Sequence, residues 1–177
     1  MPSDPRPEVT DPEAYIAAII AKIGSRDPLD VIAETPAALA ERVAPHSVET
    51  LRARPAEGMW SPLEILGHLV DAEFVFGFRG RTIFCDDRPL LVGIEQGDWV
   101  ARQRHHDADP QVLLDEFAAL RRVNLRFWRS LTPDDMARVG RHQERGDEPL
   151  GRLRSLLAGH DVWHLEQFDR YIAAARA

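Results

Sequence analysis

Two histidines, His160 and His164, lie one helical turn apart in the C-terminal segment 150–175, where apolar residues recur at helical spacing. At about 100° per residue, both imidazoles project into the apolar arc of that helix. Side chains at i and i+4 are neighbours, so both can bind one metal ion. A buried polar group without a partner costs about 1–3 kcal/mol. The pair therefore indicates either shared metal ligation or two core histidines bonded to carboxylates or backbone groups.

His68 is the best candidate for a third ligand. It lies two turns into a helix that we expect to begin after Ser61, on a polar strip between two apolar arcs. That strip fits a solvated helix face, and it equally fits the lining of an internal cleft. Three histidine ligands would leave one coordination position open, as in catalytic zinc sites.

Other titratable residues near these histidines receive simpler interpretations. Asp161 occupies the position of the glutamate in H-E-x-x-H, but it is a shorter aspartate with no accompanying strand, so we do not expect a zincin-type protease. Glu64 fits a helix-capping role and Asp71 a surface charge. His105 and His106 are adjacent and cannot share a helix face, so we place both at the surface.

The elements that must position these side chains are helical. Ser61-Pro62-Leu63-Glu64 has the spacing of a capping box with proline at the first helical position, and predicts a helix to about Phe84. We expect the segment 139–148, with His142, to be a polar loop. Long helices with short connections predict an antiparallel bundle. Further helices are predicted at 11–23, at 29–43 with an interruption near Pro36, at 98–106, at 109–130 and at 150–175.

Composition narrows the class of protein. The chain has 177 residues and a net charge of −7 with no basic run, which argues against nucleic-acid binding. We place the arginines Arg121, Arg122 and Arg126 on a solvated helix face. No apolar run approaches the roughly 20 residues of a membrane span. The single cysteine, Cys85, excludes an intramolecular disulfide and a cysteine-based zinc site, so we expect a cytoplasmic protein.

Two segments together resemble a known family. Trp60-Ser61-Pro62-Leu63-Glu64-Ile65-Leu66-Gly67-His68-Leu69-Val70-Asp71-Ala72-Glu73 is followed far downstream by His160-Asp161-Val162-Trp163-His164-Leu165-Glu166-Gln167. Their order and spacing resemble the DinB-like superfamily, which is distinct from the DNA polymerase of that name. The resemblance covers about residues 51–172, and leaves residues 1–45 outside as an extension.

The resemblance implies an all-α fold, an antiparallel four-helix bundle, here with an extra N-terminal helical segment. It implies a divalent metal, most often Zn²⁺ or Ni²⁺, held by His68, His160 and His164. It also implies homodimers. Characterised members of the family include S-transferases that use bacillithiol or mycothiol and a mycothiol-dependent maleylpyruvate isomerase, and other members are described as metal-dependent hydrolases.

From these observations we expect residues 1–10 to be a disordered lead and residues 11–177 to form one DinB-like domain. We expect a metal-dependent thiol S-transferase that uses a low-molecular-weight thiol on small electrophiles. The alternatives are a metal-dependent hydrolase and a non-enzymatic, metal- or ligand-binding stress protein. The expected partners are a small-molecule substrate and a second copy of the chain, without nucleic acid or membrane.

Overall fold

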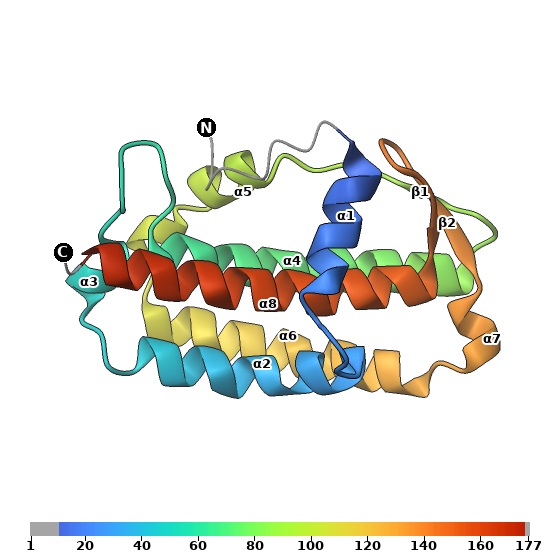
Figure 1. Cartoon of the computed structure of the whole chain (residues 1–177), viewed down its shortest axis with the longest axis horizontal. Coiled ribbons are helices and arrows are strands. Elements are labelled where there is room, and N and C mark those ends of the chain that lie inside the picture. Colours follow the sequence, from blue (N-terminus) through green and yellow to red (C-terminus); the bar gives the residue numbers. More distant parts are fainter. Residues whose placement is uncertain (1–10, 176–177) are drawn as a thin grey trace.

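Four long helices form the body of the molecule (Figure 1). In this computed structural model, which describes residues 11–175, they are α2 (Pro28–Val43), α4 (Pro62–Cys85), α6 (Pro110–Ser130) and α8 (Leu150–Ala175). Each packs against two others, so that α2, α8, α4 and α6 close into a ring whose buried apolar residues form two clusters. Figure 1 shows α2 and α8 running in one direction and α4 and α6 in the other. The predicted four-helix bundle is confirmed, whereas the expected disordered lead, 1–10, lies outside the described residues.

The extra N-terminal segment is the helix α1 (Pro12–Ala21), which crosses α8 (Figure 1). Its residues Ile16 and Ile19 are buried against the bundle. The approach is close because α8 has Gly159 at the crossing, where a Cβ atom would meet the backbone carbonyl of Ile19. The glycine that precedes His160 therefore lets α1 lie against the bundle beside that histidine.

The helix α4 begins with the predicted capping box. The Ser61 hydroxyl accepts a hydrogen bond from the Glu64 amide, and the Glu64 carboxylate accepts one from the Ser61 amide at 2.8 Å. Arg54 donates two further hydrogen bonds to the same carboxylate. Almost the whole circumference of α4 is buried over its first three turns, because α5, α6 and α8 all pack on it. His68 therefore lies inside the protein and not on a solvated face.

Pro36 does not interrupt α2, contrary to the prediction. A proline inside a helix cannot donate to the carbonyl four residues earlier, which here is that of Ile32. The Ile32 carbonyl instead accepts a hydrogen bond of 2.8 Å from Nη1 of Arg121 on α6. A side chain from a neighbouring helix thus supplies the donor that proline lacks, and the helix continues to Val43.

The segment 139–148 is a β-hairpin and not the polar loop that we predicted. Strand β2 (Val139–His142) pairs antiparallel with β3 (Gly146–Pro149), and β1 (Leu90–Leu91) adds to β2 in parallel. In β2 the inward positions alternate, but they are occupied by Gly140 and His142, so no apolar alternation marks the strand. Short helices complete the chain: α3 (Val48–Arg52), α5 (Gln96–Arg102), the 3-10 turn η1 (His105–Asp107) and α7 (Pro133–Met136).

A buried charged cluster links all four bundle helices. Arg121, which we predicted on a solvated face, is 1% exposed. It forms ion pairs with Asp161 on α8 and, at 2.8 Å, with Glu73 on α4. Its bond to the Ile32 carbonyl adds α2. The prediction was wrong because a guanidinium with two buried carboxylate partners is stable in a core, and those partners are far from it in sequence.

No helix within residues 11–175 combines the length and the apolar character needed to cross a membrane.

Candidate metal centre

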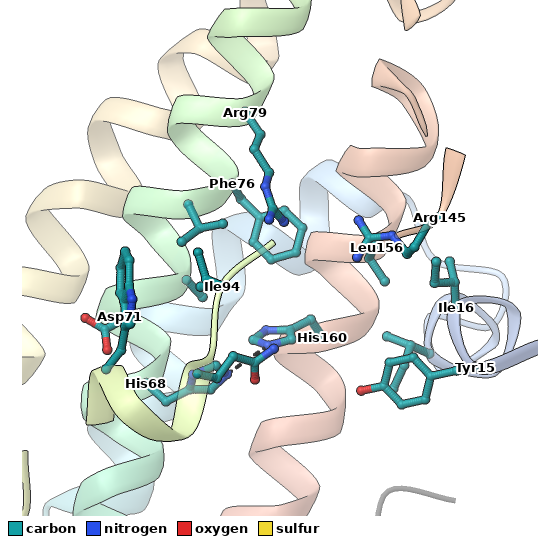
Figure 2. Close-up of a pocket in the computed structure, with 15 residues that line it drawn as sticks. Tyr15, Ile16, His68, Asp71, Phe76, Arg79, Ile94, Arg145, Leu156 and His160 are labelled. Atoms are coloured by element: carbon teal, nitrogen blue, oxygen red, sulfur yellow. Dashed lines mark hydrogen bonds between the residues drawn. The ribbon is translucent and has the colours of Figure 1, made fainter. Parts of the chain in front are cut away.

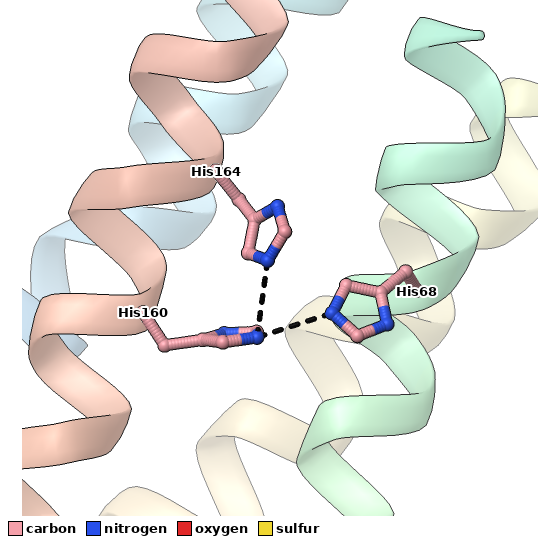
Figure 3. A group of neighbouring side chains, drawn as sticks. All are labelled: His68, His160 and His164. Atoms are coloured by element: carbon pink, nitrogen blue, oxygen red, sulfur yellow. Dashed lines mark hydrogen bonds between the residues drawn. The ribbon is translucent and has the colours of Figure 1, made fainter. Parts of the chain in front are cut away.

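The three predicted ligand residues converge at one point between α4 and α8 (Figure 3). Nε2 of His160 lies 3.1 Å from Nε2 of His68 and 3.1 Å from Nε2 of His164. The three side chains each offer a nitrogen within 4.8 Å of the other two. His68 comes from α4, and the other two come from successive turns of α8, as their i and i+4 spacing requires.

This donor set fits a divalent metal ion. Zinc–nitrogen bonds of about 2.0–2.1 Å at tetrahedral angles place ligand nitrogens about 3.3 Å apart. The two separations of 3.1 Å are close to that value. Borderline-soft ions such as Zn²⁺ and Ni²⁺ favour imidazole nitrogen. The residues present could therefore hold such an ion without large movements of the three side chains.

Burial keeps the two imidazoles of α8 neutral, which metal ligation requires. Desolvation, and then the nearby His164 and His68, lower the pKa of His160 well below its ordinary value. Desolvation likewise lowers the pKa of His164 to about 4, although the hydrogen bond that His164 donates to Gln167 acts in the opposite direction. At neutral pH both side chains consequently offer lone pairs and carry no charge.

Gln167 orients His164. Its Oε1 accepts from Nδ1 of His164 at 2.7 Å, which leaves Nε2 of His164 unprotonated and directed at the cluster. The Gln167 amide in turn donates to the Tyr171 hydroxyl at 3.0 Å. Sequence reasoning assigned Gln167 no role, although its position one helical turn after His164 was a usable signal.

Aromatic rings confine the other two imidazoles. The ring of Trp60, directly before the α4 cap, lies 5.0 Å from the His68 ring between centroids. The Phe76 ring lies 5.7 Å from that of His160. These contacts limit the rotation of both imidazoles and keep bulk water from most of the cluster.

Asp161 faces away from the histidines. Its carboxylate accepts from Thr35 at 2.9 Å and pairs with Arg121, and it is fully buried. It is therefore a structural residue of α8, and it cannot serve as the general base of an H-E-x-x-H site. This agrees with the expectation that the chain is not a zincin-type protease.

A pocket opens beside the cluster (Figure 2). His68 and His160 lie in its wall. The remaining wall residues come from α1, α4, the 94–99 segment, the hairpin and α8: Tyr15, Ile16, Ile19, Asp71, Ala72, Val75, Phe76, Arg79, Ile94, Gln96, Trp99, Arg145 and Leu156. Trp99 is 36% exposed and lies in the wall of this pocket. A small molecule in this pocket would reach two of the three histidines.

Asp71 and His105 correct two predictions. Both were expected at the surface, yet they are 3% and 6% exposed. Nε2 of His105 lies 3.0 Å from Oδ2 of Asp71, and Gln103 donates to Oδ1 at 2.8 Å. Gly67 makes this possible, because a Cβ atom there would meet the His105 ring. The pairing of α4 with the 103–105 segment is a long-range contact that residue spacing does not reveal.

Comparisons with known proteins agree with this architecture. A family model described as the DinB superfamily matches residues 32–168. The curated protein "Putative metal-dependent hydrolase OB0782" of Oceanobacillus iheyensis is 23% identical over 137 residues, which is 77% of this chain and 79% of that protein. The solved structure of YfiT from Bacillus subtilis, described as a probable metal-dependent hydrolase with an unusual four-helix bundle topology, superposes with a TM-score of 0.74. It is 20% identical, and the match covers 82% of this chain and 86% of that one.

Proposed function

Because the chain belongs to the DinB superfamily and its three-histidine cluster opens on a pocket, we propose that it is a divalent-metal-dependent hydrolase of small molecules. The observation that carries the proposal is the convergence of three imidazole nitrogens, two of which belong to residues in the pocket wall. The names of two similar proteins support the same reaction class.

His68, His160 and His164 would hold the ion. A divalent metal in such a site would supply Lewis-acid chemistry, since it would polarise a carbonyl group of the substrate and lower the pKa of a bound water to a value near neutrality. The chain itself supplies imidazole ligands, a shielded wall and a pocket that admits substrate to two of the ligand residues. No carboxylate belongs to the cluster, so the positive charge of a bound ion would not be reduced by its ligands.

Asp71 is the candidate proton acceptor. It follows His68 by nearly one turn of α4 and lies in the wall of the same pocket. Gln103 and His105 fix its carboxylate by one contact to each oxygen, which leaves further lone pairs available. A carboxylate held beside the reacting group can take a proton from an attacking nucleophile.

Thiol S-transfer is the second candidate, with a low-molecular-weight thiol as the nucleophile in place of water. The observation that favours it is the uncharged ligand set, because an ion that keeps its full charge stabilises a thiolate as well as it activates water. The resemblance to bacillithiol- and mycothiol-dependent members points the same way.

One experiment separates the candidates. The protein, reconstituted with Zn²⁺ or Ni²⁺, is assayed on a panel of small esters and amides without thiol, and then on an electrophilic bimane probe with bacillithiol, mycothiol or cysteine. We expect metal-dependent hydrolysis that falls at least 100-fold in His164→Ala and persists in His106→Ala, which removes a histidine outside the cluster. Turnover only with thiol would establish S-transfer. Metal binding without turnover in either assay would leave a non-enzymatic binding protein.

A further inference from the structure

Arg79 is a buried cation that forms no ion pair with the residues that the structure describes. It is 8% exposed and lies in the wall of the pocket that reaches His68 and His160. Its guanidinium donates to the Val92 carbonyl at 2.6 Å. Among residues 11–175, no carboxylate lies within ion-pair distance of it. A charge taken out of water without a partner is strongly unfavourable, so the free protein leaves this group incompletely satisfied.

A second guanidinium, that of Arg145, lies in the wall of the same pocket. Arg145 follows β2 in the hairpin and pairs with Glu148 at 3.0 Å, with 18% of its side chain exposed. Its Nε is buried and has no hydrogen-bond partner within the described part of the chain. Glu148 also lies near Arg152, so that one carboxylate serves more than one cation. Donor capacity at this end of the pocket therefore exceeds the acceptors around it.

The two guanidinium groups at this end of the pocket act on each other and on a nearby histidine. Burial and the charge of Arg145 lower the pKa of Arg79 to about 10, and Glu148 and Glu144 offset this only in part. Burial is the larger cause that lowers the pKa of His142 to about 4, and the charges of Arg145 and Arg79 act in the same direction. Arg79 nevertheless stays protonated at neutral pH, and it keeps its positive charge beside that of Arg145.

We propose that Arg79 and Arg145 bind an anionic group of the substrate, a carboxylate or a phosphate, while its reacting group lies at His68 and His160. Figure 2 shows both guanidinium groups toward the end of the pocket away from His68, and the apolar residues Phe76, Ile94 and Leu156 line the same pocket. Guanidinium groups match carboxylate and phosphate oxygens in geometry and charge. The substrate is then a small ester or amide with an apolar spacer and an anionic end. The substrate class rests on the proposed function, because it assumes hydrolysis, whereas the binding of an anion by the two arginines does not.

Binding is tested without reference to turnover. Glutarate, neutral glutaramide and inorganic phosphate are titrated calorimetrically into the zinc-loaded protein. We expect glutarate or phosphate to bind, and glutaramide to bind at least tenfold more weakly. Both Arg79→Gln and Arg145→Gln should lower the affinity for the anion at least tenfold, which corresponds to about 1.4 kcal/mol. The control, Arg81→Gln, removes the same charge two residues along α4 and outside the pocket, and should leave the affinity within twofold. The stronger of the two anions identifies the group.

Equal anion affinity in wild type, Arg79→Gln and Arg145→Gln would overturn the proposal, because the anion would then bind elsewhere. Two variants are used so that misfolding of one, detected by its melting curve, still leaves a test. Turnover adds a second readout, the ratio of kcat/KM for mono-p-nitrophenyl glutarate to that for p-nitrophenyl butyrate. We expect a ratio above ten that falls toward one in Arg145→Gln.

The experiments give different results if the hydrolase proposal fails and if the anion-site proposal fails. If neither ester is hydrolysed but anion affinity depends on both arginines, the anion site stands and the hydrolase proposal fails. If both esters are hydrolysed at equal rates and the arginine variants leave the ratio unchanged, the hydrolase stands and the anion site fails.

Discussion

Replacing Arg121 with methionine tests whether the buried charged cluster holds the bundle together. Methionine keeps most of the length of the side chain and removes its charge and donors. Asp161 and Glu73, both at most 1% exposed, would lose their shared cation, and the Ile32 carbonyl would lose the donor that compensates for Pro36. The substitution therefore leaves two carboxylates and one carbonyl in the core without their principal partner.

The expected loss of stability is large. Removing one partner of a buried ion pair costs about 3–5 kcal/mol, because the other charge remains buried. Two carboxylates are stranded here, so we expect about 4–5 kcal/mol at pH 7.5. Burial already raises the pKa of Glu73, even beside Arg121. Without the arginine, the folded protein takes up a proton more readily than the unfolded chain, so the loss should shrink as the pH falls toward 5.

The assay is equilibrium unfolding in urea at pH 7.5 and pH 5.5 under saturating zinc, followed by tryptophan fluorescence. Arg122→Met, an exposed neighbour on α6, is the control and should change the free energy of unfolding by less than about 0.5 kcal/mol. The triple variant Glu73→Gln/Arg121→Met/Asp161→Asn should recover part of the loss, since it strands no charge. A loss below about 1 kcal/mol in Arg121→Met at pH 7.5, or a larger loss at pH 5.5, would refute the reasoning.

Three further predictions concern the metal centre and its surroundings. Gln167→Leu removes the acceptor of the His164 Nδ1–H, so zinc affinity should fall about 10–100-fold in competition with a chelator, and an unchanged affinity would show that Gln167 does not orient the ligand. The metal-free protein should lose about 3 kcal/mol of stability through His164 alone as the pH falls from 6.5 to about 4, because the unfolded chain protonates this histidine where the folded one does not; urea unfolding with chelator checks this, and a flat profile contradicts it. Gly159→Ala should cost about 1–3 kcal/mol in thermal unfolding because its methyl group meets the Ile19 carbonyl, and wild-type stability would mean that α1 does not pack closely there.

Local signals in the sequence predicted most of the bundle. The capping box at Ser61 and the Asp109-Pro110 start placed the beginnings of α4 and α6, because caps act over three or four residues. The i and i+4 spacing placed His160 and His164 on one face of α8. His68 needed the family resemblance, since its own helix pattern fitted a solvated face equally well.

The remaining features depend on contacts between residues distant in sequence. Arg121 carries no mark that separates it from the exposed Arg122, and only Glu73 and Asp161 on other helices make its burial stable. Asp71 and His105 satisfy each other from separate segments, and so neither is solvated. The hairpin was missed because its inward positions are not apolar. The homodimer stays a prediction from the resemblance.

The most direct test of the account is the metal content of the protein itself. The wild-type chain and the variant His68→Ala/His160→Ala/His164→Ala are reconstituted with Zn²⁺ or Ni²⁺, passed through gel filtration and analysed by plasma mass spectrometry. We expect about one metal ion per chain in the wild type, as for a single closed donor set, and almost none in the variant. Equal metal content in the two proteins, or none in either, would contradict a metal centre at these histidines and leave them as core residues.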